Sequence, residues 1–415
     1  MSTFIVQRAL ALAAFSPAVL AQGPVFQTPG MTSVPSNYSV PGSSNDSGQA
    51  NRFSNVFNPA FSFVVDSLVD SIHNSGASED GERIELRSLE FAAQSWVDPS
   101  AWAYFVAVAD EENVAIEEAA VHYTGLGGNH TLRAGRFFID FGKQMQTHVH
   151  ELRTIRRPLA LRTFLGDEVK GDGLQWDSWT SVSDETAVRW SIGAFSNLLP
   201  ESVKDIDPET QAAQSIADRK HAEDFNFTAR LTAFTDVGQN GVLQLGTSAR
   251  VLPRFAYTFE PSGDAAEDLD NTVFGLDATY GWSDDSGLKS WTFGGEYVLD
   301  TGDTYSTIGD AGTPGDPTDD SVDVISDELN GFYIFADYAW DKSNSVGLQY
   351  SQVESPEAGT PDVSETEAYY THLFSEFHRL RVAASGQNRE DGEDSTRFAI
   401  QYTVFVGAHG HGVNW

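Results

Sequence analysis

The chain has 415 residues, of which 40% are hydrophobic, and a formal net charge of −35. It contains no cysteine, which excludes a disulfide framework and thiol chemistry. The acidic excess argues against nucleic acid as a partner, and no segment beyond the N-terminus offers the ~18 consecutive apolar residues of a membrane-spanning helix.

The first 21 residues have the pattern of a secretory signal peptide. Arg8 precedes the apolar stretch 9–15, and Val19 and Ala21 occupy the small-residue positions of a cleavage site. We therefore expect cleavage before Gln22. Residues 22–56 are rich in Ser, Asn, Pro and Gly, which predicts a flexible N-terminal segment.

From residue 57 onwards, segments of about ten residues with an apolar side chain at every second position recur along the chain. Successive side chains of a strand point to opposite faces, so each segment predicts a strand with one apolar and one polar face. The predicted strands cover residues 60–69, 83–95, 100–110, 113–125, 130–138, 172–181, 186–196, 225–235, 241–251, 272–282, 288–299, 329–341, 344–352, 367–374, 378–388 and 396–407.

The lengths of the connections alternate from the fifth predicted strand onwards. The long connections 139–171, 197–224, 252–271 and 300–328 alternate with short ones such as 182–185. Long extracellular loops and short periplasmic turns are typical of an outer-membrane barrel. The sequence therefore predicts an all-β fold, a transmembrane antiparallel β-barrel of about 16 strands over residues 57–415, located in the cell outer membrane and in contact with its lipids.

The apolar stripes of the predicted strands end in aromatic residues. Phe332, Ile334 and Ala336 share a face with Tyr338 and Trp340. Tyrosine and tryptophan at the ends of such stripes are typical of the girdles at membrane interfaces. The opposite faces carry the basic residues Arg189, Arg230, Arg250 and Arg381, which predicts a polar, water-filled lumen.

Basic residues are concentrated between Arg133 and Lys170. If the long connection in this segment folds into the lumen, its guanidinium groups would narrow the pore and attract anions. In the alternative, the loop is solvated or packed on the wall, and its arginines pair with carboxylates of the lumen. The predicted constriction residues are Arg133, Arg136, Lys143, Arg153, Arg156, Arg157 and Arg162.

A resemblance to known proteins is confined to the same segment. The stretch Leu132–Gly142, LRAGRFFIDFG, resembles the G-[RK]-F-x-x-x-[FY]-G element of the phosphate-selective porin O and P family. His148–Glu151, Arg157–Pro158 and Phe164–Gly166 resemble a related group of Gram-negative outer-membrane proteins that includes sequences labelled as zinc-regulated. The resemblance implies a porin-type barrel.

Two features of the sequence suit metal ions. His148, His150 and Glu151 can supply zinc ligands, or they can make structural polar contacts. The acidic loops Glu260–Asp270 and Asp310–Glu328 can bind calcium, although solvated loops have the same composition. Neither pattern requires a cofactor.

The function predicted from these features is passive diffusion of small polar or anionic solutes through an outer-membrane porin, and a homotrimer is the expected assembly. A metal-binding or adhesive surface barrel is the alternative. An outer-membrane enzyme is less favoured because no Gly-x-Ser-x-Gly element is present. An energy-coupled transporter would need about 22 strands and a plug.

Overall fold

The computed structural model describes residues 60–74, 80–109, 114–196, 198, 212–213, 221–259, 264–309, 321–354, 362–389 and 394–407. The predicted signal peptide and the segment 22–56 lie outside these residues and stay predictions. Within the described residues, no helix is long and apolar enough to cross a membrane.

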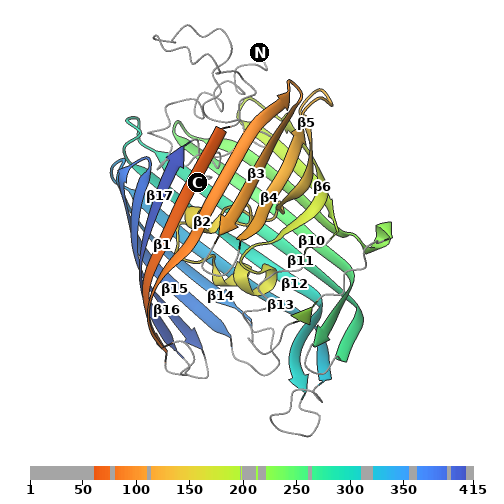
Figure 1. Ribbon diagram of the computed structural model, residues 1–415. Helices are drawn as coiled ribbons and strands as arrows, with labels where there is room; N and C mark the ends of the chain where they lie inside the picture. The colour runs from red at the N-terminus through yellow and green to blue at the C-terminus, as the bar shows by residue number, and fades with distance from the viewer. Residues whose placement is uncertain are drawn as a thin grey trace.

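Sixteen antiparallel strands form a closed barrel (Figure 1), as the sequence predicts. Each predicted strand corresponds to an observed one. They are β1 (Ala60–Asn74), β2 (Gly81–Asp98), β3 (Ala101–Ala109), β4 (Val114–Tyr123), β5 (His130–Phe138), β6 (Lys170–Ser181), β7 (Thr186–Phe195), β9 (Asn226–Val237), β10 (Gly241–Phe259), β11 (Asp264–Ser283), β12 (Ser290–Gly309), β13 (Ser321–Ala339), β14 (Asn344–Val353), β15 (Val363–Ser375), β16 (His378–Arg389) and β17 (Ser395–Gly407).

The barrel closes where the first wall strand meets the last. β1 pairs with β17 from Ser62 opposite Gly407 to Asn74 opposite Ser395. A further two-residue strand, β8 (Ala212–Ala213), pairs only with the end of β10 and is not part of the closed wall. Because every wall strand has a partner on both sides, the closed sheet leaves no free edge, which is what a lipid environment requires.

The two faces of the wall have opposite character. On β11, Phe274 and Leu276 face outwards and are exposed, whereas Val273 directly before them and Asp277 directly after them are buried. Ile334 on β13 and Trp340, which directly follows that strand, are likewise exposed. An apolar belt on the outside of a closed barrel fits insertion into a lipid bilayer.

The connections at the two ends of the barrel differ, but less than predicted. Short turns such as 182–185, 238–240 and 376–377 lie at the end where β1 begins and β17 ends. At the other end, β10 to β13 extend beyond the predicted strands, so the expected long connections 252–271 and 300–328 shrink to 260–263 and 310–320. The acidic segment 264–270 therefore lies in a strand, because its backbone pairs with β10 although its apolar residues do not alternate. Residues 260–263 and 310–320 lie outside the described residues.

Candidate functional site: a loop folded into the lumen

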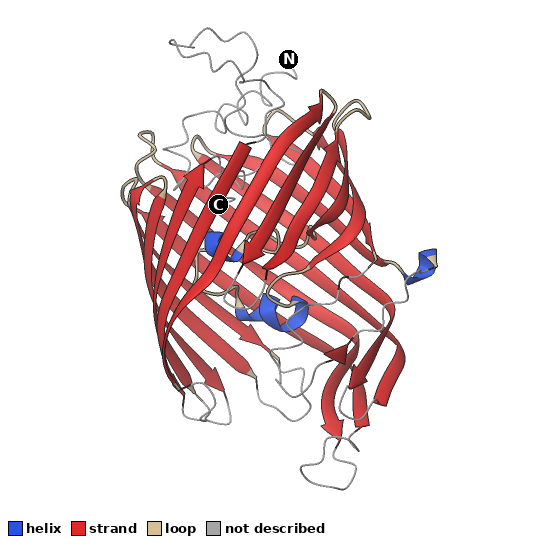
Figure 2. Ribbon diagram, viewed as in Figure 1, coloured by secondary structure: helices blue, strands red, loops and turns tan. Residues whose placement is uncertain are grey.

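The chain between β5 and β6 folds into the barrel. Its ends stay close together, since Phe138 pairs with Lys170 and Ile139 N–H donates to the carbonyl oxygen of Val169 at 3.0 Å. The loop 139–169 contains the short helices η1 (Val149–Glu151) and α3 (Leu159–Leu165). Both lie inside the wall in Figure 2. We call this segment the lumen loop.

An apolar cluster fixes one side of the lumen loop. Phe141, Leu161 and Phe164 are buried in one cluster with inward-facing residues of the wall, among them Val273 and Val298. Burial of apolar surface is the main favourable contribution to such docking. These wall residues interrupt the polar inner face, so part of the lumen is filled by a hydrophobic core rather than by water.

Arginines of the wall donate hydrogen bonds to backbone carbonyls of the lumen loop. Arg87 donates to Ile155 O at 2.7 Å and to Val149 O at 3.3 Å. Arg381 donates to Thr154 O at 3.2 Å. Further donors of this kind are Arg379 to His150 O and Arg250 to Phe164 O. The predicted lumen residues Arg250 and Arg381 thus hold the loop as well as face inwards.

Carboxylates of the wall complete this anchoring by accepting backbone N–H groups. Glu296 accepts from Lys143 N at 2.7 Å and from Gln144 N at 3.2 Å, and Tyr333 OH donates to the same oxygen at 2.6 Å. Gly142 precedes this turn with φ of 55°, and a Cβ here would collide with the Glu296 carboxylate. The turn therefore needs glycine for its backbone angle and for close approach.

Asp140, at the start of the lumen loop, joins two of the predicted lumen arginines. It accepts from Ser191 at 2.6 Å and forms ion pairs with Arg189 at 2.7 Å and Arg230 at 3.6 Å. Arg230 also contacts Asp277 at 2.7 Å. Burial opposes the charge of Asp140, but Arg189 and Arg230 outweigh it and hold the pKa of this carboxyl below its usual value.

The remaining basic residues of the predicted constriction take different positions. Arg153 pairs with Asp337 at 3.2 Å and Arg162 pairs with Glu365 at 2.7 Å, which is the wall-paired alternative. Arg133 donates to Gln175 and lines a small polar cavity with Arg189. Lys143 donates to Gln244 at 2.9 Å.

Two of the predicted constriction residues do not line the lumen. Arg157 is 1% exposed and donates to the carbonyl oxygens of Gln144 and Thr147, so it holds the lumen loop together and does not reach water. Arg136 lies on the outward parity of β5 and pairs with Asp172 at 2.9 Å on the exposed surface. Strand geometry puts Arg133 and Arg136 on opposite faces, because the side chain at position i+3 points to the face opposite that of position i.

Arg156 differs from the other arginines of the lumen loop. It is half-buried, and within the described residues it forms no ion pair. Burial and the neighbouring Arg397 and Arg162 lower its pKa to about 10, so it is still charged at neutral pH. A charged, partly accessible guanidinium next to other cations is suited to attract a mobile anion.

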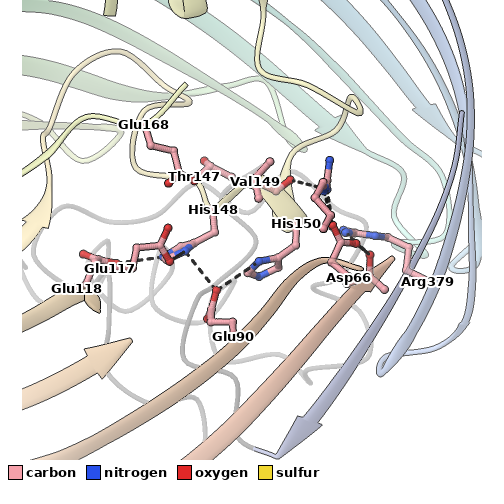
Figure 3. A network of polar contacts seen from close by, with 12 residues as sticks. Asp66, Glu90, Glu117, Glu118, Thr147, His148, Val149, His150, Glu168 and Arg379 are labelled. Carbon is pink, nitrogen blue, oxygen red and sulfur yellow. Dashed lines mark hydrogen bonds and ion pairs between the residues drawn. The ribbon is translucent and has the colours of Figure 1, made fainter. Parts of the chain in front are cut away.

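The two histidines of the lumen loop meet carboxylates of the wall (Figure 3). His148 Nδ1 lies 3.4 Å from Glu90 Oε2 and 3.0 Å from Glu117 Oε2, and its Nε2 lies 3.1 Å from Glu118 Oε1. His150 Nδ1 lies 3.4 Å from the same Glu90 oxygen. Burial disfavours the charged imidazole, but Glu117 and Glu90 hold the pKa of His148 well above its usual value.

The structure corrects the predicted metal triad in one position. Glu90, His148 and His150 bring ligand atoms within 4.8 Å of one another, whereas Glu151, although buried, is not part of this group. Glu90 was missed because it lies on a strand 58 positions before His148; the only sequence signal was a carboxylate on the inward parity of β2.

A β-bulge explains how two consecutive carboxylates reach one imidazole. Between β3 and β4, Val106 pairs with Glu118 but Ala107 pairs with Ile116, so Glu117 is the extra residue. Both Glu117 and Glu118 are consequently buried on the lumen side. Two adjacent acids that interrupt strand alternation were the available signal.

The comparisons with known proteins agree with this fold. No protein-family model matches the chain, so the resemblance to the phosphate-selective porin family is not confirmed. An uncharacterised protein of Aquifex aeolicus (strain VF5) is 24% identical over 389 residues, which cover 84% of this chain and 77% of that protein.

Solved outer-membrane barrels share the architecture at low identity. An anion-selective porin from Comamonas acidovorans has a TM-score of 0.53 at 11% identity, over 84% of this chain and 99% of that one. OprB of Pseudomonas putida has a TM-score of 0.53 at 10% identity, over 84% and 94%. OmpT, an outer membrane protein of Vibrio cholerae, has a TM-score of 0.52 at 12% identity in its loop L8 deletion mutant, over 85% and 100%. The chain thus has the closed-barrel fold of these outer-membrane proteins.

Proposed function

We propose that this chain is a porin that lets small polar or anionic solutes diffuse passively across the outer membrane. The observation that carries the proposal is the lumen loop, which crosses the inside of a closed wall and brings basic side chains into it. A loop that is anchored on several strands narrows the lumen of a barrel, whereas a separate plug domain would close it. We propose a channel rather than an enzyme because the described polar clusters serve to hold this loop.

Arg156 is the residue on which we place the anion preference. Arg153 is paired with Asp337 at 3.2 Å, and Arg162 is paired with Glu365 at 2.7 Å. Because a carboxylate offsets each charge, these two arginines attract an anion in the lumen only weakly. Arg156 forms no ion pair within the described part of the chain. Arg397 and Arg162 add to the positive potential around it, and the more distant carboxylates of Glu365 and Asp167 offset part of that potential. The arrangement favours anions as a class and does not distinguish phosphate from a carboxylate.

For the assembly we propose a homotrimer. The in-vitro folded OmpT of Vibrio cholerae is described in a trimer form, and it covers 85% of this chain with a TM-score of 0.50. Cross-linking in detergent would show a trimer band under this proposal, and a band no larger than the monomer would contradict it.

Planar-bilayer recordings across a salt gradient test the channel and its selectivity together. We expect discrete conductance steps and a reversal potential on the anion side. Arg156→Gln should move the reversal potential towards cations, most clearly at low salt where screening is weak. Arg136→Gln is the matched control, since Arg136 lies on the outer face. Absence of conductance from folded protein would contradict the porin proposal, and an equal shift in both variants would contradict the role of Arg156.

A further inference from the structure

We propose that Glu90, His148 and His150 form a binding site for a divalent transition-metal ion of the zinc class, and that this ion would link the lumen loop to the wall. His148 and His150 belong to the lumen loop, whereas Glu90 belongs to β2. The site thus joins two parts of the chain that meet only in the folded barrel. Arg156 is not part of this site.

The spacing of the ligand atoms suits a tetrahedral ion. Zinc bonds to nitrogen and oxygen are about 2.0 to 2.2 Å long, so tetrahedral ligands stand about 3.4 Å from one another. His148 Nδ1 and His150 Nδ1 each lie 3.4 Å from Glu90 Oε2. Two of the three ligand–ligand distances therefore already have the required length.

The orientation of His148 is that of a metal ligand. Its Nε2 faces Glu118 Oε1 at 3.1 Å, so an Nε2–H can donate there and leave the lone pair of Nδ1 on the side of Glu117, at 3.0 Å, and Glu90, at 3.4 Å. The other oxygen of Glu118 accepts from Tyr104 OH at 2.7 Å, which fixes the carboxylate. A histidine that binds a metal through one nitrogen and donates to a carboxylate through the other is a recurring arrangement in metal sites. Glu118 would be a positioning residue.

Charge balance also favours a divalent cation. Glu90, Glu117 and Glu118 converge on one buried imidazole, and Lys170 Nζ lies 3.7 Å from Glu117. A proton on His148 offsets a single carboxylate, whereas a divalent ion offsets two; Lys170, which is shared with Glu168 at 3.2 Å, offsets the others only in part. The ion would replace that proton, since imidazole binds metals in its neutral form.

A simple ion-pair network is the competing explanation. It accounts for His148 between three carboxylates, but it does not require the second imidazole, His150, to contact the same oxygen of Glu90. The ring centroids of the two histidines are 5.6 Å apart, so two positive charges here would repel each other. One shared ion accounts for both histidines. Two nitrogen ligands with one carboxylate favour zinc-like ions over calcium, which prefers oxygen ligands.

The test uses the untagged full chain folded in detergent and stripped with a chelator. We expect one equivalent of Zn²⁺ per chain by calorimetry, and visible absorption bands of tetrahedral Co²⁺ when cobalt is used as the probe. Glu118→Gln should retain the cobalt bands but lower the affinity about 10- to 100-fold, as loss of an outer partner does. Zinc should also slow proteolysis within the lumen loop of the wild type.

Ligand substitutions separate the site from adventitious binding. Glu90→Gln and His148→Ala with His150→Ala should abolish stoichiometric binding, whereas Glu151→Gln should leave it unchanged. Glu151 is the matched control because it is a buried neighbour outside the ligand group. If the folded wild type binds no stoichiometric zinc, or if Glu90→Gln binds as tightly as the wild type, the proposal is overturned. Should the double variant fail to fold, Glu90→Gln and the cobalt spectrum of the wild type still decide.

Discussion

Arg87 of β2 donates a hydrogen bond of 2.7 Å to the carbonyl oxygen of Ile155, 68 positions further along the chain. The same guanidinium donates to Asp66 of β1 at 2.6 Å and to Val149 O at 3.3 Å. One side chain therefore connects two wall strands with the lumen loop. The ion pair with Asp66 fixes the orientation of the Arg87 guanidinium. Its N–H groups that face the lumen loop therefore hold the loop backbone in one position.

Replacing Arg87 by Met should loosen the lumen loop. Hydrogen bonds to a charged group contribute about 1.5 to 3 kcal/mol each, so we expect lower thermal stability in detergent and a larger, noisier single-channel conductance. Arg83→Met is the control on the same strand, since Arg83 is more exposed and approaches Asp70 only at 3.5 Å. An unchanged conductance in Arg87→Met would show that the loop does not depend on this anchor.

Asp140→Asn should destabilise the folded barrel by about 1.5 to 3 kcal/mol, because it removes one charged partner from the buried Arg189 and Arg230, which keep only Asp177 and Asp277. The pKa of Asp140 is held below its usual value, so its contribution is complete above about pH 4 and is lost as the pH falls further. Heat-modified mobility on gels measures the change. Asp172→Asn, on the exposed surface, is the comparison; equal stability of the two variants would contradict the prediction.

Lys143 should make the anion preference depend on pH. Burial lowers its pKa to about 8, so the side chain is charged below that pH and neutral above it. The reversal potential should therefore move towards cations between roughly pH 7 and pH 9. Lys143→Gln should remove this dependence, whereas Lys289→Gln, in an exposed turn, should retain it. A shift that persists in Lys143→Gln would assign the titration to another group.

The outer belt should reject charge. Leu276 is 59% exposed in the middle of β11, and Leu276→Arg should cost roughly 2 to 4 kcal/mol if this position contacts lipid. Val114→Arg is the control, since Val114 is exposed at the first position of β4, near the end of the wall. Refolding yields into lipid vesicles measure both. Equal yields would mean that Leu276 lies outside the bilayer.

The wall was predictable because strand alternation is a local property of the sequence. Each apolar stripe, such as that of Phe274 and Leu276, can be recognised without knowledge of its neighbours. The extensions of β10 to β13 were missed because their acidic and glycine-rich residues do not alternate, and only pairing with a neighbouring strand makes them extended.

The site was predictable only in part, because its partners depend on which wall segments face the lumen loop. The basic segment and the histidine pair were visible in the sequence. The role of Glu90 was not, and neither was the contact between Arg379 and His150, which lie 229 positions apart. The bulge at Glu117 is indicated only by two adjacent acids that interrupt the alternation, and it decides whether one or two carboxylates turn inwards.

The seam between β1 and β17 has a consequence for the order of assembly. Asp66 of β1 accepts from Gln401 at 2.8 Å and from Thr403 at 2.7 Å, and the loop anchors Arg87 and Arg379 stand on the strands that flank this seam. The lumen loop thus connects the strands on the two sides of this seam from inside the barrel. These hydrogen bonds can form only once β16 and β17 are in place. We therefore expect the lumen loop to dock and the barrel to close in a single late step of assembly.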